Sequence, residues 1–440
     1  MKILHITQYC HLGSIGGTER YVLDLIRELD VLHVESAIGW VTLQSKENAH
    51  LESFQVFLLP GVPMRVDGPH PELRLIFASV IADFQPSIIH FHTFGRSEAA
   101  VARCASLQGI PYVFTYHSPA WTCRREDLMA FNRASLCDGE VRIFRCAACK
   151  MHERLEFAPV WLAWALVFLT LPLCIMLAFF PQTGFRRKVA FLADTWMFRS
   201  ELRQFLKKCS RVFACAEWSI PVLTANGTSM EQIAKCPQGV SQELPLSEIP
   251  RSRPRKQEEF TIGYVGRVVP VKGVDILVEG FSKLSFNNVK LHIYGWPENA
   301  PKDAFYHCIA EAAKKDRRIH LLPKFDLPEM AKIYQKIDLL CIPSVWPETG
   351  PLVLFEALQR GIPVYGSSRV GQLGLLQERG RVVEPNTVEQ WHIALDAALR
   401  KHGHGEWDDV CEKAKGKGKL RAMNDVAEEI NKAYSSILSV

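Results

Sequence analysis

The stretch DLLCIPSVWPETGPLVLFEALQRGIPVYG, residues 338–366, decides the fold of the second half of the chain. It begins with a short apolar run, 338–342, that predicts a buried strand, and it ends with a second such run at 362–365. Between them a turn-rich loop leads at Pro351 into an apolar periodicity that predicts a helix. Strand, loop, helix and strand in this order indicate a parallel α/β sheet.

Two carboxylates in this stretch, Glu348 and Glu356, are separated by seven residues. Glu348 follows the strand at its carboxyl end and Glu356 lies about a turn and a half into the helix, so a ligand at the helix N-terminus would reach both. Backbone amides from Gly350 to Leu352 would face an anion there, because the first N–H groups of a helix are unpaired. Acids for hydroxyls and amides for phosphate suit a nucleotide sugar; two ordinary surface carboxylates are the alternative.

The segment FTIGYVGRVVPVKG, residues 260–273, supplies two cations at a fixed spacing, Arg267 and Lys272. Its first residues predict a strand, and an apolar period after Gly273 predicts a helix. A guanidinium and an ammonium on a loop that leaves the carboxyl end of a strand would converge on a pyrophosphate. Ordinary solvated surface charges are the alternative.

Apolar runs in the rest of the chain predict two sheets. The first half alternates short apolar runs with helical periods, which predicts a parallel sheet covered on both faces, a Rossmann-like domain. Its expected strands are 3–7, 36–42, 55–59, 87–91 and 112–116, with helices at 18–29, 71–84 and 97–108. The expected domains are 1–245, a Pro-rich and charged linker at 246–259, a second Rossmann-like domain at 260–412, and a C-terminal helical segment at 413–440 that packs back on the first domain.

Two places in the first half are candidate ligand sites. The first expected strand runs into a glycine loop that includes Gly16 and Gly17, where the backbone can approach a ligand closely. The loop lacks the G-x-G-x-x-G spacing, so a dinucleotide cofactor is not expected, and simple turn chemistry is the alternative. His117 follows the strand at 112–116, at the carboxyl end where such sheets bind ligands. A structural histidine is the alternative there.

The run P-E-T-G-P-L-V-L-F-E-A-L, residues 347–358, resembles the signature of the group-one retaining glycosyltransferases, family 4 of that enzyme class. The spacing G-R-x-x-x-x-K-G at 266–273 resembles the family's diphosphate-binding loop, and GGTERYVLDL at 16–25 looks like its first loop. His117 matches a His that these enzymes keep beside the donor sugar. Many members have Asp next, where this chain has Ser118, so the way this His is oriented stays open.

The resemblance implies the GT-B arrangement, in which two Rossmann-like domains face each other across a cleft. It implies transfer of a sugar from a nucleoside diphosphate sugar, of UDP or GDP type, with retention of anomeric configuration. Glu348 would bind the sugar hydroxyls, Glu356 the ribose, and Arg267 with Lys272 the leaving diphosphate. The residues expected in catalysis are His117, Glu348, Arg267 and Lys272, and those expected to bind the donor are Gly16, Gly17, Arg267, Lys272, Glu348, Gly350, Pro351, Leu352 and Glu356. No D-x-D triplet occurs, so a catalytic divalent metal is not required.

Cys123, Cys137, Cys146 and Cys149, the last two as C-x-x-C, lie among several arginines. Four thiolates can enclose a tetrahedral zinc, which would stabilise this loop-like region. Zinc sites of this type usually have two close pairs, and this set has one. A structural zinc and plain reduced thiols are therefore equal alternatives.

Residues 158–180, APVWLAWALVFLTLPLCIMLAFF, contain no charge and are long enough for a transmembrane candidate. A single span would place His117 and Glu348 on opposite sides of the membrane. We expect instead a helix of about fourteen residues, a break at Pro172 and a shorter apolar return to the same face. Trp161 and Trp164 suit a membrane interface, and the basic residues 186–188 would meet anionic headgroups. A buried hydrophobic insertion is the alternative.

The composition sets the remaining expectations. The 440 residues are enough for two domains, and a net charge of +5 fits an anionic ligand or a membrane surface without demanding nucleic acid. The N-terminus lacks the apolar run of an export signal, so the thirteen cysteines are expected to be reduced and the protein to be cytoplasmic, at the inner face of the membrane.

The apolar insert favours a lipid-linked acceptor, in bacterial polysaccharide assembly. Two other classes stay open: a sugar-nucleotide epimerase that uses the same fold without an acceptor, and a non-catalytic membrane adaptor that binds a nucleotide sugar. The insert has no purpose in an epimerase, and the complete set of donor-binding side chains argues against an adaptor.

Overall fold

The fold is described from a computed structural model, which covers residues 1–8, 16–42, 54–61, 71–131, 135–155, 158–172, 191–240, 259–325 and 329–439. The chain forms two compact units: unit 1 consists of Met1–Pro237 and Met423–Val440, and unit 2 of Gln238–Ala422. The sequence placed this boundary after residue 245, and the structure places it after Pro237. Of the expected linker at 246–259, all but Glu259 lies outside the described residues.

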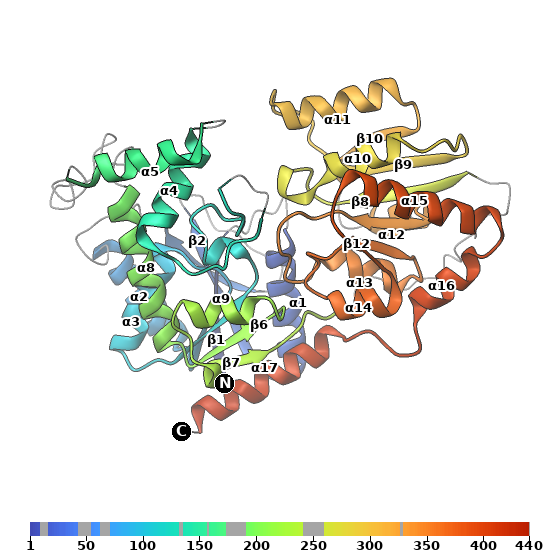
Figure 1. Ribbon diagram of the computed structural model, residues 1–440. Coiled ribbons are helices and arrows are strands. Elements are labelled where there is room, and N and C mark those ends of the chain that lie inside the picture. Colours follow the sequence, from blue (N-terminus) through green and yellow to red (C-terminus); the bar gives the residue numbers. More distant parts are fainter. Residues whose placement is uncertain are drawn as a thin grey trace. The chain divides into compact units, whose positions relative to one another are not determined.

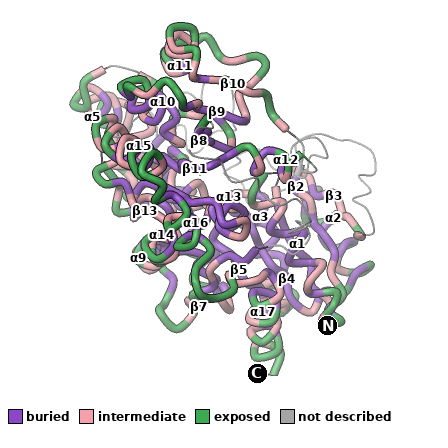
Figure 2. Tube along the Cα trace, turned by 90° about the vertical axis from the view of Figure 1, so that its right-hand side faces the viewer, coloured by how far each residue is buried: buried purple, intermediate pink, exposed green. Residues whose placement is uncertain are grey.

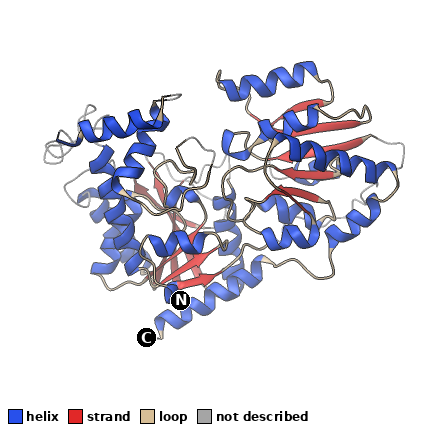
Figure 3. Cartoon of the chain, in the orientation of Figure 1, coloured by secondary structure: helices blue, strands red, loops and turns tan. Residues whose placement is uncertain are grey.

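Unit 1 is built on a parallel sheet with the strand order β3-β2-β1-β4-β5-β6-β7. Its apolar runs form strands because helices cover both faces of the sheet (Figure 3), which confirms the predicted Rossmann-like fold. The strands are β1 (Lys2–Gln8), β2 (Glu35–Thr42), β3 (Gln55–Pro60), β4 (Ile88–Phe91), β5 (Tyr112–Tyr116), β6 (Arg211–Ala214) and β7 (Ile233–Lys235). The helices are α1 (Gly17–Val31), α2 (Pro71–Phe84), α3 (Arg96–Leu107), α4 (Ile143–Arg154), α5 (Val160–Leu169), α8 (Phe191–Lys208), α9 (Ser219–Ala225) and α17 (Met423–Leu438), with short 3-10 turns at Pro119–Trp121 and Met230–Gln232.

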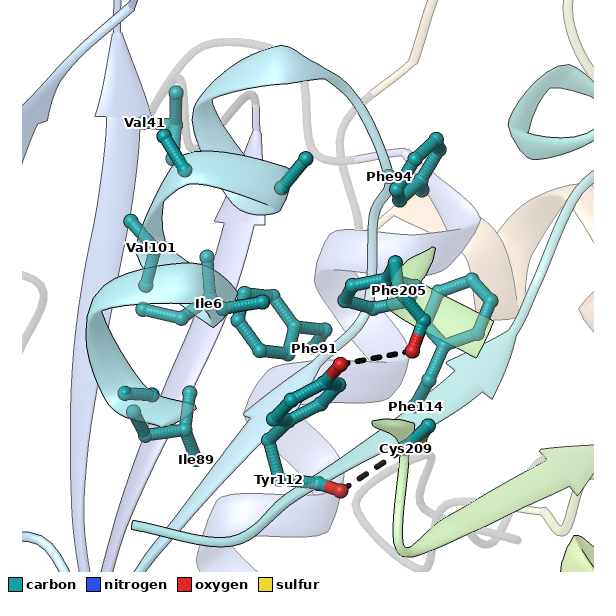
Figure 4. Close-up of a cluster of buried hydrophobic side chains, with 14 of the residues drawn as sticks. Ile6, Val41, Ile89, Phe91, Phe94, Val101, Tyr112, Phe114, Phe205 and Cys209 are labelled. Atoms are coloured by element: carbon teal, nitrogen blue, oxygen red, sulfur yellow. Dashed lines mark hydrogen bonds between the residues drawn. The ribbon is translucent and has the colours of Figure 1, made fainter. Parts of the chain in front are cut away.

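The two faces of this sheet bury different side chains, because neighbouring residues in a strand point to opposite sides. On one face Ile6, Phe91 and Phe114 pack with Val101 of α3 and Phe205 of α8 (Figure 4). The hydroxyl of Tyr112 donates to the carbonyl oxygen of Phe205 at 2.8 Å, which fastens α8 to β5. The other face is covered by α1 and by α17, so the last helix of the chain belongs to unit 1.

Unit 2 contains a second parallel sheet, with the strand order β10-β9-β8-β11-β12-β13 (Figure 1). The central strands β8, β11 and β12 are buried, the edge strands are partly buried, and the outer faces of the helices are exposed (Figure 2), as expected for a sheet between two helical layers. The strands are β8 (Phe260–Val265), β9 (Val289–Trp296), β10 (Ile319–Pro323), β11 (Leu339–Ile342), β12 (Val364–Ser367) and β13 (Arg381–Val383). The helices are α10 (Val274–Ser282), α11 (Ala304–Lys315), α12 (Met330–Gln335), α13 (Leu352–Gln359), α14 (Leu373–Arg379), α15 (Val388–Gly403) and α16 (Trp407–Lys415), with a 3-10 turn, η3, at Pro270–Lys272.

The apolar insert forms one described helix, α5, which is shorter than predicted. It has ten residues rather than about fourteen and ends at Leu169, where the Thr170 hydroxyl bonds back to the carbonyl oxygen of Leu166 at 2.8 Å. One side of α5 packs against α4 through the buried Ala163 and Val167. Residues 173–180 of the insert and 186–188 lie outside the described residues. Within the described ranges, no helix combines the length and apolar character needed to cross a membrane.

Candidate active site

The candidate donor site lies where the strand order of unit 2 reverses, between the neighbouring strands β8 and β11. Open parallel sheets bind ligands at such a switch point, outside the carboxyl ends of the strands. The loop after β8 carries Arg267, whose side chain is exposed, and the half-buried Lys272. The loop after β11 carries the buried Glu348. The structure therefore brings these three predicted site residues to one edge of one sheet.

Lys272 and Glu348 form the central contact of this edge. The Lys272 Nζ atom lies 2.8 Å from Oε1 of Glu348, and the Ser344 hydroxyl donates to the same oxygen. The side chain of Glu348 is only 7% exposed and that of Lys272 18%, so the pair is largely removed from water. The ammonium also lies 5.3 Å from the centre of the Trp346 ring, a cation–π contact. A cation and an anion are thus fixed side by side at the switch point.

Two glycines make the backbone of the cation loop possible. Gly273 has φ of 66°, and a Cβ atom there would lie 2.2 Å from the carbonyl oxygen of Pro343, which precedes Ser344. Gly295 at the end of β9 has φ of 106°, and its Cβ would lie 2.1 Å from the carbonyl oxygen of Gly266. Only glycine fits a left-handed backbone at such close approach. The loop after β8 is consequently pressed against its neighbours on both sides.

Hydrogen bonds from Asn386 and to Arg369 fix the loop after β11. The side-chain amide of Asn386 donates to the carbonyl oxygens of Pro343 and Ser344 at 3.0 and 3.1 Å, and the backbone N–H of Glu348 donates to Arg369 O at 2.8 Å. The Tyr264 hydroxyl donates to Arg267 O at 2.7 Å, and burial raises the pKa of Tyr264, with Glu348 adding to that effect. Tyr264 therefore stays a neutral donor. Together these hydrogen bonds fix the backbone that carries Arg267 and Glu348.

Glu356 and the start of α13 form the second part of the candidate donor site. Pro351 is the N-cap residue of α13 and Leu352 its first residue, so the helix begins where the sequence predicted, and its first N–H groups start at Leu352 because Pro351 has none. Glu356 is buried, and the Tyr334 hydroxyl of α12 donates to its Oε2 at 2.6 Å. Gly350 packs against Gln238, whose Oε1 would lie 2.9 Å from a Cβ at that position.

Ser344, Trp346 and Tyr334 contact the charged groups but were not assigned site roles from the sequence. Each of them gains a role only through its contact with Lys272, Glu348 or Glu356. A hydroxyl two residues after a buried strand is the one sequence signal that could have singled out Ser344.

The predicted residues of unit 1 gather at the carboxyl edge of the other sheet. His117 follows β5 and is buried, and the ring of Tyr21 meets it edge-on with 4.5 Å between ring centres. Tyr21 lies one turn into α1, whose first residue is Gly17 and whose N-cap is Gly16. The start of α1 and His117 therefore share one corner of unit 1. Gly13 and Ser14 of the same glycine loop lie outside the described residues.

Three histidines that the sequence did not single out accompany His117. They are His5 on β1 and His90 and His92 on and after β4, all fully buried. Burial lowers the pKa of His5 and of His117 to about 3, and it lowers the pKa of His90 and His92 well below the usual value. All four imidazoles are consequently neutral at physiological pH.

His5, His90 and His92 also bring one possible ligand atom each within 4.8 Å of one another, a spacing compatible with a metal ion. Both ring nitrogens of His90 are already engaged, however, by the Tyr434 hydroxyl at 2.5 Å and by the Thr115 hydroxyl at 2.7 Å. Among the residues that the structure describes, no other group of three or more candidate ligands meets this spacing.

The four cysteines of the predicted zinc site lie in one region around α4, as free thiols. Guanidinium groups contact two of them: Arg145 Nη2 lies 2.9 Å from Cys137 Sγ, and Arg125 Nη1 lies 3.7 Å from Cys149 Sγ. Burial raises the pKa of Cys123 to about 11 and of Cys146 to about 12. In this conformation the described thiols do not form a cluster of three within 4.8 Å, and zinc binding by the four stays a prediction.

Family models match the segments of the chain that carry the candidate site residues of both units. The model described as "Glycosyl transferases group 1" matches residues 247–417, and that described as "Glycosyltransferase Family 4" matches residues 15–137. The chain belongs to the group-one glycosyltransferases. The first match contains Arg267, Lys272, Glu348 and Glu356, and the second contains His117. The apolar insert of this group-one glycosyltransferase, residues 158–180, lies outside the two matched segments.

Individual relatives agree with this assignment. The D-inositol 3-phosphate glycosyltransferase of Mycobacterium marinum is 29% identical over 152 residues, which are 33% of this chain and 32% of the relative. The match thus spans about a third of that curated relative. Among solved structures, HepE of Anabaena in complex with UDP and glucose has a TM-score of 0.66 at 15% identity, covering 99% of this chain and 100% of HepE. The sucrose-phosphate synthase of Thermosynechococcus elongatus has a TM-score of 0.67 at 15% identity, covering 100% and 99%. These structures show that the group-one glycosyltransferase has the GT-B fold, with two Rossmann-like parallel-sheet domains.

Proposed function

We propose that the protein transfers a sugar from a nucleoside diphosphate sugar to an acceptor hydroxyl, with retention of anomeric configuration. The observation that carries the proposal is the buried Lys272–Glu348 pair at the switch point of unit 2. Family membership supports it, as does the fact that HepE was solved with UDP and with UDP-glucose.

The charges of the pair suit the two halves of such a donor. An ammonium would hold the diphosphate, and a carboxylate would accept hydrogen bonds from the sugar hydroxyls. With Nζ and Oε1 2.8 Å apart, the bond between sugar and phosphate would lie over the pair itself. Arg267, exposed on the same loop, would add the second cation for the diphosphate.

Negative charge grows on the leaving diphosphate as the bond to the sugar breaks. Lys272 and the N–H groups at the start of α13 are fixed before the reaction, so they would stabilise that charge without reorganising, and the exposed Arg267 would add to them. Glu356, held by the Tyr334 hydroxyl, would take the ribose. His117 would lie beside the donor sugar, a role that rests on the family resemblance.

The reaction is tested by incubating the purified protein with UDP, GDP and ADP sugars and measuring release of the nucleoside diphosphate. We expect one donor to be consumed by the wild type, and Arg267→Ala to lower the rate about a hundredfold. The anomeric configuration of the product, read by proton NMR, should match that of the donor. Tight donor binding without turnover for any acceptor would instead identify a non-catalytic adaptor.

We further propose that α5 embeds in the membrane interface and that the acceptor is lipid-linked. Trp161 (68%) and Leu169 (76%) of α5 are exposed, and so is Phe168, whose ring stacks on Phe144, an exposed residue of α4. Ten helical residues extend about 15 Å, roughly half of a bilayer core, a length suited to one leaflet. An aromatic and aliphatic face of this kind binds at the boundary of headgroups and acyl chains.

Vesicle flotation tests the membrane proposal. We expect the wild type to float with vesicles containing anionic lipid in 1 M salt, and Trp161→Asp with Leu169→Asp to abolish flotation. Leu107→Asp is the matched control, because Leu107 is 78% exposed on unit 1 but lies at the end of α3. Release of the wild type by salt alone would contradict the proposal.

A further inference from the structure

Two loops of unit 2 meet at one carbonyl group beside the Lys272–Glu348 pair. The backbone N–H groups of Val345 and Trp346, in the loop after β11, donate to the carbonyl oxygen of Val271 at 2.9 and 3.3 Å. Val271 directly precedes Lys272 in the 3-10 turn η3. The backbone at the base of the Lys272 side chain is therefore tied to the backbone of Trp346.

The side chains of Lys272 and Trp346 meet as well. Lys272 Nζ lies 5.3 Å from the centre of the Trp346 ring, within the distance at which the negative face of an indole attracts a cation. The same nitrogen lies 2.8 Å from Oε1 of Glu348. The Lys272 side chain is still 18% exposed, and Trp346 is partly exposed. The ammonium is therefore restrained by two partners and remains accessible from solvent.

An aromatic ring is a suitable second partner for an ammonium that has to bind an anion. The ammonium has three N–H groups, and the carboxylate of Glu348 takes one of them. A second carboxylate in the place of the ring would give this group of side chains a net negative charge, which repels a diphosphate. The indole carries no net charge, so it restrains the flexible lysine side chain without opposing an anionic ligand.

We propose that Trp346 is a positioning residue, which holds the Lys272 ammonium beside Glu348 so that its remaining N–H groups meet the diphosphate of the donor. This role rests on the proposed function. Because the restraint exists before the ligand arrives, binding does not have to order the lysine side chain. The affinity for a nucleoside diphosphate should therefore depend on the electron density of the Trp346 ring.

The indole N–H group allows a conservative comparison. Trp346 Nε1 is buried and has no hydrogen-bond partner among the described residues. Trp346→Phe therefore keeps an aromatic face and breaks no hydrogen bond to them, whereas Trp346→Leu removes the face. We expect the affinity for UDP, GDP or ADP, whichever binds the wild type, to fall about tenfold in Trp346→Leu and at most about threefold in Trp346→Phe.

The test is calorimetric titration of UDP, GDP and ADP into full chains that carry a fluorinated tryptophan at position 346 alone. Fluorine withdraws electron density from the ring face and preserves the shape of the side chain, so it weakens the attraction to a cation with little effect on packing. With one to four fluorines the affinity should fall stepwise, by about tenfold in total, and in the Lys272→Met background it should change less than about twofold. The control is the four-fluorine ring at Trp196, which is 57% exposed on α8 and should leave binding unchanged.

The ¹⁹F resonance of a single fluorine at Trp346, recorded without nucleotide, tests the contact itself. It should move in Lys272→Met, and it should stay in place in Lys290→Met, whose exposed pair with Glu259 lies elsewhere in unit 2. If it moves, and UDP, GDP and ADP all fail to bind the wild type, the proposed function is refuted and the contact is structural alone.

Four other results would overturn the positioning role while nucleotide binding stands. They are an affinity that does not change with fluorination, an equal loss in the Lys272→Met background, Trp346→Phe binding as weakly as Trp346→Leu, and a ¹⁹F resonance that ignores Lys272→Met. The fluorinated series decides the matter even where Trp346→Leu fails to fold, because it preserves the shape of the ring.

Discussion

Substitutions in the Lys272–Glu348 pair can separate its contribution to stability from its contribution to donor turnover. Lys272→Met removes the ammonium and leaves a carboxylate that is 7% exposed without its counter-ion. Breaking a buried pair in this way costs about 3–5 kcal/mol when both partners are fully buried. Because Lys272 is 18% exposed and Ser344 still donates to the same oxygen, we expect a loss of about 2–3 kcal/mol, which lowers the melting temperature of a unit of this size by about 5–10 °C.

The double variant Lys272→Met with Glu348→Gln completes the cycle. Removing both charges should recover about 1–2 kcal/mol of the lost stability, because no unpaired carboxylate remains buried. Donor turnover should stay at least about a hundredfold below the wild type in both variants, because the cation for the leaving group is absent. The control is Lys290→Met, whose partner Glu259 lies 2.6 Å away in an exposed pair; its loss should cost below about 1 kcal/mol and leave turnover unchanged.

Calorimetric unfolding and nucleoside diphosphate release measure the two effects. A Lys272→Met variant that melts with the wild type and turns over donor at the wild-type rate would refute the reasoning. Recovery of turnover in the double variant would show that the pair matters for folding alone.

Three further predictions follow from the same geometry. Gly273→Ala should lower the free energy of unfolding by about 2 kcal/mol or more, because a left-handed backbone disfavours Cβ and the new atom would lie 2.2 Å from Pro343 O. The control Gly374→Ala in α14 has open space around the new atom, so its free energy of unfolding should stay within about 1 kcal/mol of the wild type. Tyr334→Phe should weaken nucleotide binding about three- to tenfold in calorimetry, since Glu356 loses its hydroxyl partner; equal affinity would exclude Glu356 from the site. The buried histidines His5 and His117 are neutral in the folded protein and bind protons in the unfolded chain, because burial lowers their pKa. The stability is therefore fully present above pH 6.5 and falls between pH 6.5 and about 3, by about 1.4 kcal/mol per pH unit for each histidine. His5→Phe should reduce the slope of stability against pH by about one proton, and an unchanged slope would contradict the burial effect.

Much of the fold could be predicted from the sequence, because strands covered on both faces must be apolar along their whole length. The run at 112–116 coincides with β5, and the run at 3–7 lies within β1. That Arg267, Lys272 and Glu348 lie at one edge of the sheet could be predicted for a related reason. These residues lie in the loops that follow two apolar runs, and parallel strands bring their carboxyl ends to one edge.

The contacts of His92 with His5 and His117 could not be predicted in this way. His5 and His92 are single polar residues in or beside apolar runs, and their contact depends on β1 pairing with β4, which no local pattern states. Tyr334 and Glu356 lie 22 residues apart and meet only through the packing of α12 on α13. The length of α5 could not be predicted from Pro172 alone, because the helix ends at Leu169, before the proline.

Titration calorimetry of UDP, GDP and ADP into the wild type and Arg267→Ala tests the central claim most directly. We predict that one nucleoside diphosphate binds the wild type and that Arg267→Ala weakens its binding at least about tenfold, because the diphosphate loses the exposed guanidinium of the loop after β8 as a partner. Lys290→Met should bind as the wild type does. Absence of binding for all three nucleotides, or equal affinity in Arg267→Ala, would contradict the assignment of the donor site to this edge of unit 2.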